Sequence, residues 1–259
     1  MRLASSAAIL AVFLAACSTL TEDPAAPYDA NPLGTGLRIH DVQNPSSPTY
    51  SPGKTVIVSS TVVSWIDTFD ETRDGKSIGT VYIQDVGSSD PYSGISVYEP
   101  SYVPASLRLL PGDVLDFNGP YQEITSVGSA MFNPGQTLPQ LAKPVGTYRY
   151  DFTTPPPVTI QLSDIDESSY LTGRKWEGML VTINDVTIGP GVDANSRVTY
   201  IMGQGDASID SNAAAISNEL YNLGSTDYPV GTHFSSVTGI VTWFYSYQVA
   251  PRSAADLKQ

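Results

Sequence analysis

Short runs of alternating hydrophobic and polar residues, separated by turns rich in glycine and proline, fill the chain from about residue 36 onward. A period of two is typical of β-strands with one buried face. The predicted strands are 56–67, 80–85, 94–98, one beginning at 113, 177–188, 197–202, and a pair within 236–250. We expect Gly119 and Pro120 to bend or bulge the strand that begins at Asp113. The pattern therefore predicts an all-β protein.

One segment departs from this period. Within residues 212–223, Ile216, Leu220 and Leu223 fall on one face of a helix. Asn212 stands where an N-cap is favoured, and a glycine follows the last apolar residue. We therefore expect one short helix in the second half of the chain.

The two halves repeat the same order of elements. Gly112 precedes a strand that contains Gly119, and Gly231 precedes a strand that contains Gly239. A long first strand, a polar loop, a second strand and a glycine-led strand pair suit a five-stranded Greek-key barrel of the OB type. A β-sandwich with a similar number of strands is the alternative.

This repeat divides the chain into two tandem OB-like five-stranded Greek-key barrels. The first is predicted over residues 36–150 and the second, which contains the short helix, over residues 158–257. Between them, Pro155-Pro156-Pro157 is typical of a stiff linker.

The N-terminus has the features of an export signal. Arg2 precedes an apolar stretch that is too short for a comfortable transmembrane helix and ends in small residues. The closing Leu-Ala-Ala-Cys resembles the lipobox of bacterial lipoproteins, which implies cleavage after residue 16 and lipid on Cys17. Residues 17–35 then form a flexible tether. An ordinary secretory signal with a leftover cysteine is the alternative, but a lone cysteine in an exported protein requires an explanation.

Composition narrows the possible functions. Among 259 residues, 13 Lys+Arg stand against 26 Asp+Glu, a formal net charge of −13. Such a polyanion is a poor partner for phosphate backbones. Two histidines and the single cysteine leave little for a His/Cys metal site or a Cys–His nucleophile. We therefore predict no catalytic centre, no metal site and no cofactor.

Several short motifs resemble the OB module found ahead of secreted bacterial nucleases of the endonuclease/exonuclease/phosphatase type. They are segments 37–43, 51–56, 83–85, 94–98 and 112–114, with 176–181 and 250–257 in the second block. Ser60 stands in the first strand where the family tends to have glycine. No nuclease domain follows before Gln259, so the resemblance implies a binding module without the enzyme.

The outer face of strands 80–85 and 94–98 is the first candidate site. Alternation turns Val81, Ile83, Ile95 and Val97 inward and leaves four polar or aromatic side chains outside: Tyr82, Gln84, Ser96 and Tyr98. OB folds bind oligonucleotides and oligosaccharides on this face, and tyrosines suit a sugar ring or a stacked base. The alternative is a cross-strand tyrosine pair packed under a loop.

An aromatic run at a predicted hairpin tip is the second candidate. It contains Trp243, Phe244, Tyr245 and Tyr247, and an exposed tip of this kind can contact a partner or a membrane. The alternative is a hairpin clamped by its own aromatic rings, or one packed on the first barrel.

An acidic segment at 67–75 begins like an EF-hand calcium loop. Its twelfth position, counted from Asp70, is Val81 rather than the required glutamate. We therefore interpret the segment as a solvated loop.

Together these features predict a lipid-anchored protein of the bacterial outer membrane that binds a glycan or another envelope protein without catalysis. Ser18, in place of an inner-membrane aspartate, indicates the outer membrane. Two alternatives stay open. Single-stranded nucleic-acid binding is favoured by the OB resemblance and disfavoured by the charge. A hydrolase is compatible with the sequence, because paired carboxylates meet only in space.

Overall fold

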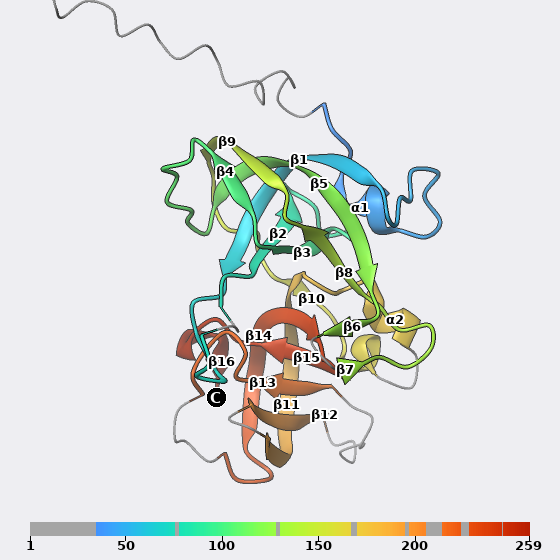
Figure 1. Ribbon diagram of the computed structural model, residues 1–259. Helices are drawn as coiled ribbons and strands as arrows, with labels where there is room; N and C mark the ends of the chain where they lie inside the picture. The colour runs from blue at the N-terminus through green and yellow to red at the C-terminus, as the bar shows by residue number, and fades with distance from the viewer. Residues whose placement is uncertain are drawn as a thin grey trace, which may run out of the picture.

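The computed structural model describes residues 35–75, 78–127, 130–166, 170–194, 197–205, 214–223, 228–244 and 246–259. Within these ranges the protein is built mainly of β-strands, which confirms the all-β prediction. Two sheets lie one above the other (Figure 1). The predicted signal segment, Cys17 and the tether up to residue 34 lie outside the described residues.

The first sheet contains β1 (Thr55–Ile66), β2 (Val81–Asp85), β3 (Gly94–Tyr98), β4 (Ser101–Val103), β5 (Asp113–Ile124), β8 (Leu138–Ala142) and β9 (Val145–Asp151). The second contains β10 (Val158–Thr159), β11 (Leu180–Ala194), β12 (Arg197–Gln204), β13 (Ala215–Ser217), β14 (His233–Trp243), β15 (Tyr247–Ala250) and β16 (Leu257–Lys258). A small hairpin consists of β6 (Ser126–Val127) and β7 (Ala130–Met131). The helices are α1 (Ile39–Gln43), α2 (Tyr170–Arg174) and the 3₁₀ turns Leu162–Ile165 and Ala254–Asp256.

Five strands of each sheet close into a barrel. The first runs β1-β2-β3-β8-β5 and the second β11-β12-β13-β15-β14, and in each the last strand pairs back to the first. Counted in chain order, the third strand of each barrel pairs in parallel with the fifth, which is β3 with β8 in the first barrel and β13 with β15 in the second. This Greek-key order is that of an OB fold, so the repeated strand order predicted from the sequence exists in three dimensions.

The first strand turns at matching positions in the two barrels. Ser60 and Asp185 both have a φ of 57°, the left-handed region that glycine adopts most easily. The carbonyl oxygen of each accepts a backbone N–H from just beyond the second strand, Val86 in one barrel and Gly205 in the other, at 2.9 Å. Ser60 therefore adopts, as a non-glycine residue, a backbone conformation that favours glycine.

At Gly119 and Pro120 the structure has no bulge against β1. However, β5 changes its other partner there, from β9 up to Asn118 to β8 from Tyr121 onward. β5 continues through both residues, and the register shift between β1 and β5 lies between Val58 and Thr61 instead. Gly119 serves a close approach, since a Cβ there would lie 2.5 Å from the Cβ of Pro144.

The predicted helix over 212–223 is also wrong. In the described part of this segment, residues 215–217 form β13, where Ile216 pairs with Tyr200 on one side and Val249 on the other. The barrel needs a third strand to close, and this pairing overrides the apolar spacing of a short segment. In the described part of the second half, the short α-helix is α2.

The two barrels pack directly against each other. The backbones of Gly94 and Gly178 approach so closely that a Cβ on Gly94 would lie 2.6 Å from the carbonyl carbon of Gly178. The N–H of Tyr92 donates to the oxygen of Lys175 at 2.6 Å. Within the described ranges, no helix is long and apolar enough to cross a membrane.

A candidate binding cavity between the two barrels

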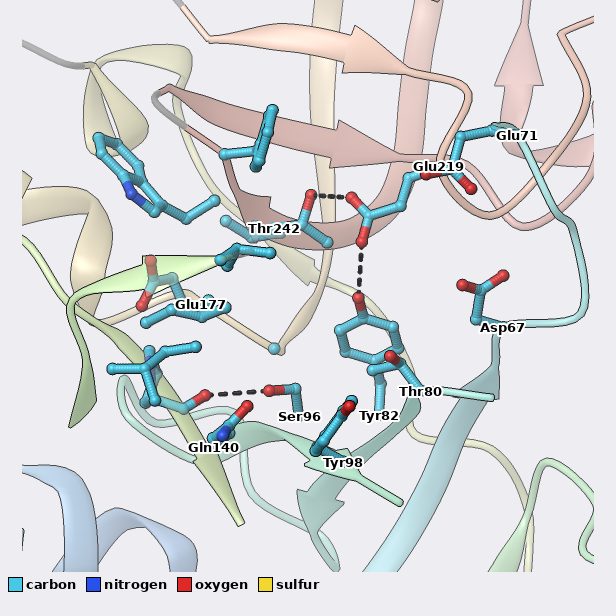
Figure 2. A pocket seen from close by; sticks show the side chains of 18 of the residues that line it. Asp67, Glu71, Thr80, Tyr82, Ser96, Tyr98, Gln140, Glu177, Glu219 and Thr242 are labelled. Atoms are coloured by element: carbon cyan, nitrogen blue, oxygen red, sulfur yellow. Dashed lines mark hydrogen bonds between the residues drawn. The ribbon is translucent and has the colours of Figure 1, made fainter. Parts of the chain in front are cut away.

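A cavity of about 570 Å³ lies where the two barrels meet. The first barrel contributes the loop after β1, parts of β2, β3 and β8, and the segment from the end of β5 to β6. The second contributes the turn before β11, the end of β14 and the segment after β13. Figure 2 shows the polar side chains that line it, among them Asp67, Glu71, Tyr82, Ser96, Tyr98, Gln140, Glu177, Glu219 and Thr242.

A hydrogen-bonded chain crosses the cavity wall from one barrel to the other (Figure 2). The Tyr82 hydroxyl donates to Oε1 of Glu219 at 2.9 Å, and the Thr242 hydroxyl donates to Oε2 at 2.7 Å. Burial raises the pKa of Tyr82, and the carboxylate of Glu219 raises it further. The Tyr82 hydroxyl therefore stays protonated and acts as a donor to Glu219.

Asp67 follows β1 and is only 4% exposed. Its Oδ1 accepts the N–H of Phe69 at 3.1 Å, and no other hydrogen bond to this carboxyl is found among the described residues. Burial raises its pKa to about 8, and Glu219, Glu71 and Asp70 act in the same direction. Figure 2 shows the side chain extending from the end of the strand into the cavity, opposite Glu177.

Glu71 shares the acidic end of the cavity with Arg197. Nη2 of Arg197 lies 3.1 Å from Oε1 of Glu71, and the guanidinium lies 4.6 Å from the centre of the Phe244 ring. Oε2 of Glu71 is buried without a hydrogen-bond partner in the described structure. Burial raises the pKa of Glu71 to about 7, and Arg197 only partly offsets this.

Glu177 lies at the other end and is tied to the packing between the barrels. Its Oε2 lies 3.5 Å from Nε of Arg174, a buried side chain of α2. Burial raises the pKa of Glu177, against the lowering effect of Arg174. Glu177 therefore has a cation, whereas Asp67 has none within hydrogen-bonding distance in the described structure.

The second barrel packs over part of the predicted outer face of β2 and β3, and the rest of the face lines the cavity. The inward set Val81, Ile83, Ile95 and Val97 is buried as predicted. Tyr82, Ser96 and Tyr98 line the cavity, with Tyr98 46% exposed. Gln84 does not line it, because it is buried and its Oε1 accepts the N–H of Leu180 at 2.7 Å. The second barrel covers Tyr82 and Gln84, so the candidate face is accessible only in part, mainly at Tyr98.

The predicted exposed aromatic tip is wrong for Trp243 and Tyr247. Both are buried in the core of the second barrel, where their ring centres lie 4.6 Å apart. Large aromatic rings gain more free energy when they are buried against other apolar groups than when they face water. Phe244 is half-buried and lines the cavity together with Trp243, while Tyr245 lies outside the described residues.

The carboxylates of the site give no signal in the sequence pattern. The prediction of a solvated loop over residues 67–75 holds for Asp74 and Gly75 but not for Asp67 and Glu71, which are buried. Glu219 was assigned to the helix that does not form. The period-two pattern marks only the strands, and the loops that carry these side chains give no comparable signal.

The arrangement is rich in hydrogen-bond acceptors and poor in cations. Among the described residues that line the cavity, five are acidic and only Arg197 is a lysine or arginine. No cluster of three or more His, Cys, Asp or Glu side chains within the described ranges is arranged to hold a metal ion. The cavity thus suits an organic ligand that donates hydrogen bonds. Comparison with protein-family models gives no match, and no curated protein matches the sequence.

Proposed function

We propose that the protein is a non-enzymatic binding lipoprotein of the bacterial outer membrane, and that its ligand is a short glycan held in the cavity between the barrels. The observation that carries this proposal is the joint presence of tyrosine rings and hydrogen-bonding side chains around one cavity of about 570 Å³. Ligand sites combine apolar rings that pack against the ligand with a few placed polar groups that orient it.

One tyrosine ring at the cavity is accessible to a ligand. Tyr98 is half exposed, next to the buried Tyr82 on the adjacent strand β2. An exposed ring can pack against the C–H face of a sugar, while Gln140 and the carboxylates accept from its hydroxyl groups. The acidic lining opposes the alternative ligand, single-stranded nucleic acid, through its phosphates.

The test uses the full-length chain, purified in an uncharged polyoxyethylene detergent so that no sugar-based detergent competes. A glycan array identifies ligands, and calorimetry at low and high salt measures affinity. We expect binding that varies little with salt and falls about tenfold in Tyr98→Ala. Tyr150→Ala, which changes an exposed tyrosine outside the cavity, serves as the matched control. Salt-sensitive binding of single-stranded DNA, with no glycan signal, would favour the nucleic-acid alternative instead.

Membrane attachment is a separate part of the proposal. Cys17 carries acyl chains, whose buried CH₂ groups contribute about 0.8 kcal/mol each, so that more than one chain anchors the protein stably. Metabolic labelling with a palmitate analogue should mark the wild-type protein in the outer-membrane fraction. Cys17→Ser should lose both the label and the membrane fractionation.

Hydrolysis is a second candidate function, favoured by one observation. Asp67 and Glu71 are buried carboxyl groups with a raised pKa in a cavity, which is a common property of catalytic acids. The test is to incubate the protein with the glycan that binds on the array and to measure the masses of the products by mass spectrometry. Intact ligand supports a binding protein, and cleavage that disappears in Asp67→Asn supports the hydrolase.

A further inference from the structure

We infer that the cavity recognises an amino sugar with a free amine, through an ion pair between the sugar's ammonium group and Asp67. This inference rests on the proposed glycan-binding function and specifies its ligand. Two independent observations carry it: the way the lining hydroxyl groups are used, and the fact that no cation among the described residues lies within hydrogen-bonding distance of Asp67.

Three of the lining hydroxyl groups in the middle of the cavity already donate within the protein. Tyr82 and Thr242 both donate to Glu219, and Ser96 donates to the carbonyl oxygen of Pro139 at 3.0 Å. What these groups present to a ligand is therefore their acceptor capacity, in addition to that of the carboxylates. A ligand that fits must bring donors of its own.

Two buried carboxyl groups of the cavity are incompletely satisfied within the described structure. Asp67 is 4% exposed and lines the cavity (Figure 2), and among the described residues only its Oδ1 accepts a hydrogen bond, while Oε2 of Glu71 has no partner there. The charged side chains that raise the pKa of Asp67, namely Glu219, Glu71 and Asp70, are all acidic. A buried carboxyl in such surroundings keeps its proton while no ligand is bound, and an ammonium group that pairs with it displaces this proton.

The cation does not come from the cavity's own arginine. Arg197 is engaged by Glu71 at 3.1 Å and by the Phe244 ring at 4.6 Å. An ammonium group supplies three donors and no acceptor, which matches the remaining groups, Asp67 and the lone pairs of the hydroxyl oxygens. An N-acetyl group would replace this charge with a carbonyl acceptor and leave Asp67 unpaired.

The experiment compares three tetrasaccharides by calorimetry on the full-length protein: glucosamine tetrasaccharide, N-acetylglucosamine tetrasaccharide and cellotetraose. We expect the glucosamine form to bind at least about tenfold more tightly than the other two, as for a charge-assisted hydrogen bond. Asp67→Asn should remove that preference while keeping the weaker binding of the neutral sugars. Asp90→Asn, which removes an exposed carboxylate outside the cavity, should change nothing.

Other outcomes overturn the inference in distinguishable ways. Equal binding of all three sugars contradicts the ammonium site and leaves the glycan function standing. No binding of any sugar contradicts the proposed function itself. Spermidine that binds as tightly as the glucosamine form contradicts an amino-sugar site. Thermal melting of Asp67→Asn shows that the variant is folded, so that a lost preference reports the site.

Discussion

Two groups of buried carboxylates lie between the barrels, and they differ in their cations. Around α2, Arg174 donates to Glu123 at 2.9 Å and to Gln43 at 3.2 Å, and it lies 3.5 Å from Glu177. In the cavity, Asp67 has no cation within hydrogen-bonding distance among the described residues, and Glu71 has only the partly exposed Arg197. The same interface thus holds one compensated cluster and one uncompensated cluster.

The difference appears in the acidity of the carboxyl groups. Burial alone would raise the pKa of Glu123, but Arg174 and the hydroxyl groups of Thr137 and Tyr121 lower it below its ordinary value. Burial raises the pKa of Asp67, and no cation offsets it. The compensated cluster stabilises the packing between the barrels. The uncompensated cluster favours binding of a positively charged group.

Removing the cation of the compensated cluster should have the largest effect. Arg174→Met leaves Glu123 and Glu177 without their buried partner, so we expect the free energy of unfolding to fall by about 3–5 kcal/mol. Urea denaturation followed by tryptophan fluorescence measures it. Arg108→Met, on an exposed arginine, is the control and should change stability by less than about 0.5 kcal/mol. A loss for Arg174→Met no larger than the control's would show that the cluster does not hold the barrels together.

The uncompensated cluster should make stability depend on pH. The pKa of Asp67 is about 8 in the folded protein and near 4 in the unfolded chain, so folding favours the protonated form. Its contribution is complete below about pH 4 and is lost as the pH rises toward about 8. Between pH 5 and pH 8 we expect the wild type to lose about 3–4 kcal/mol more unfolding free energy than Asp67→Asn.

Melting curves across this range provide the measurement. The carboxyl groups that face Asp67, namely Glu219, Glu71 and Asp70, remain in both proteins, so the difference between the two curves isolates Asp67. Parallel curves for the wild type and Asp67→Asn would mean that the carboxyl has an ordinary pKa.

The hydrogen bond that links the barrels across the cavity should have an intermediate effect. Tyr82→Phe keeps the ring and removes the donor to Glu219, so we expect a loss of about 1 kcal/mol in unfolding free energy. Tyr148→Phe breaks a similar bond to Asp151 at the surface and should cost less. Equal losses in the two variants would mean that burial adds nothing to the Tyr82 bond.

The smallest effect on stability should come from the mouth of the cavity. Tyr98 is 46% exposed, so Tyr98→Ala should change the unfolding free energy by less than about 0.5 kcal/mol while weakening glycan binding. A large loss of stability would assign Tyr98 to the packing rather than to the ligand.

The period-two pattern was sufficient for the architecture. Val81, Ile83, Ile95 and Val97 are buried where alternation places them, and the glycine-led repeat corresponds to two barrels of the same strand order. It was insufficient for residues 212–223, whose apolar spacing suits a helix. There β13 forms because its backbone pairs with β12 and β15.

The sequence by itself determined which side chains face each barrel's interior, because alternation along a strand is a local property of the backbone. Only the tertiary structure decided the site. Three of the four residues predicted on the β2–β3 face, together with Trp243 and Phe244, line one cavity because the second barrel packs there. Asp67 and Glu219 lie far apart in sequence, and their burial in one cavity arises from contacts between barrels that no local pattern encodes.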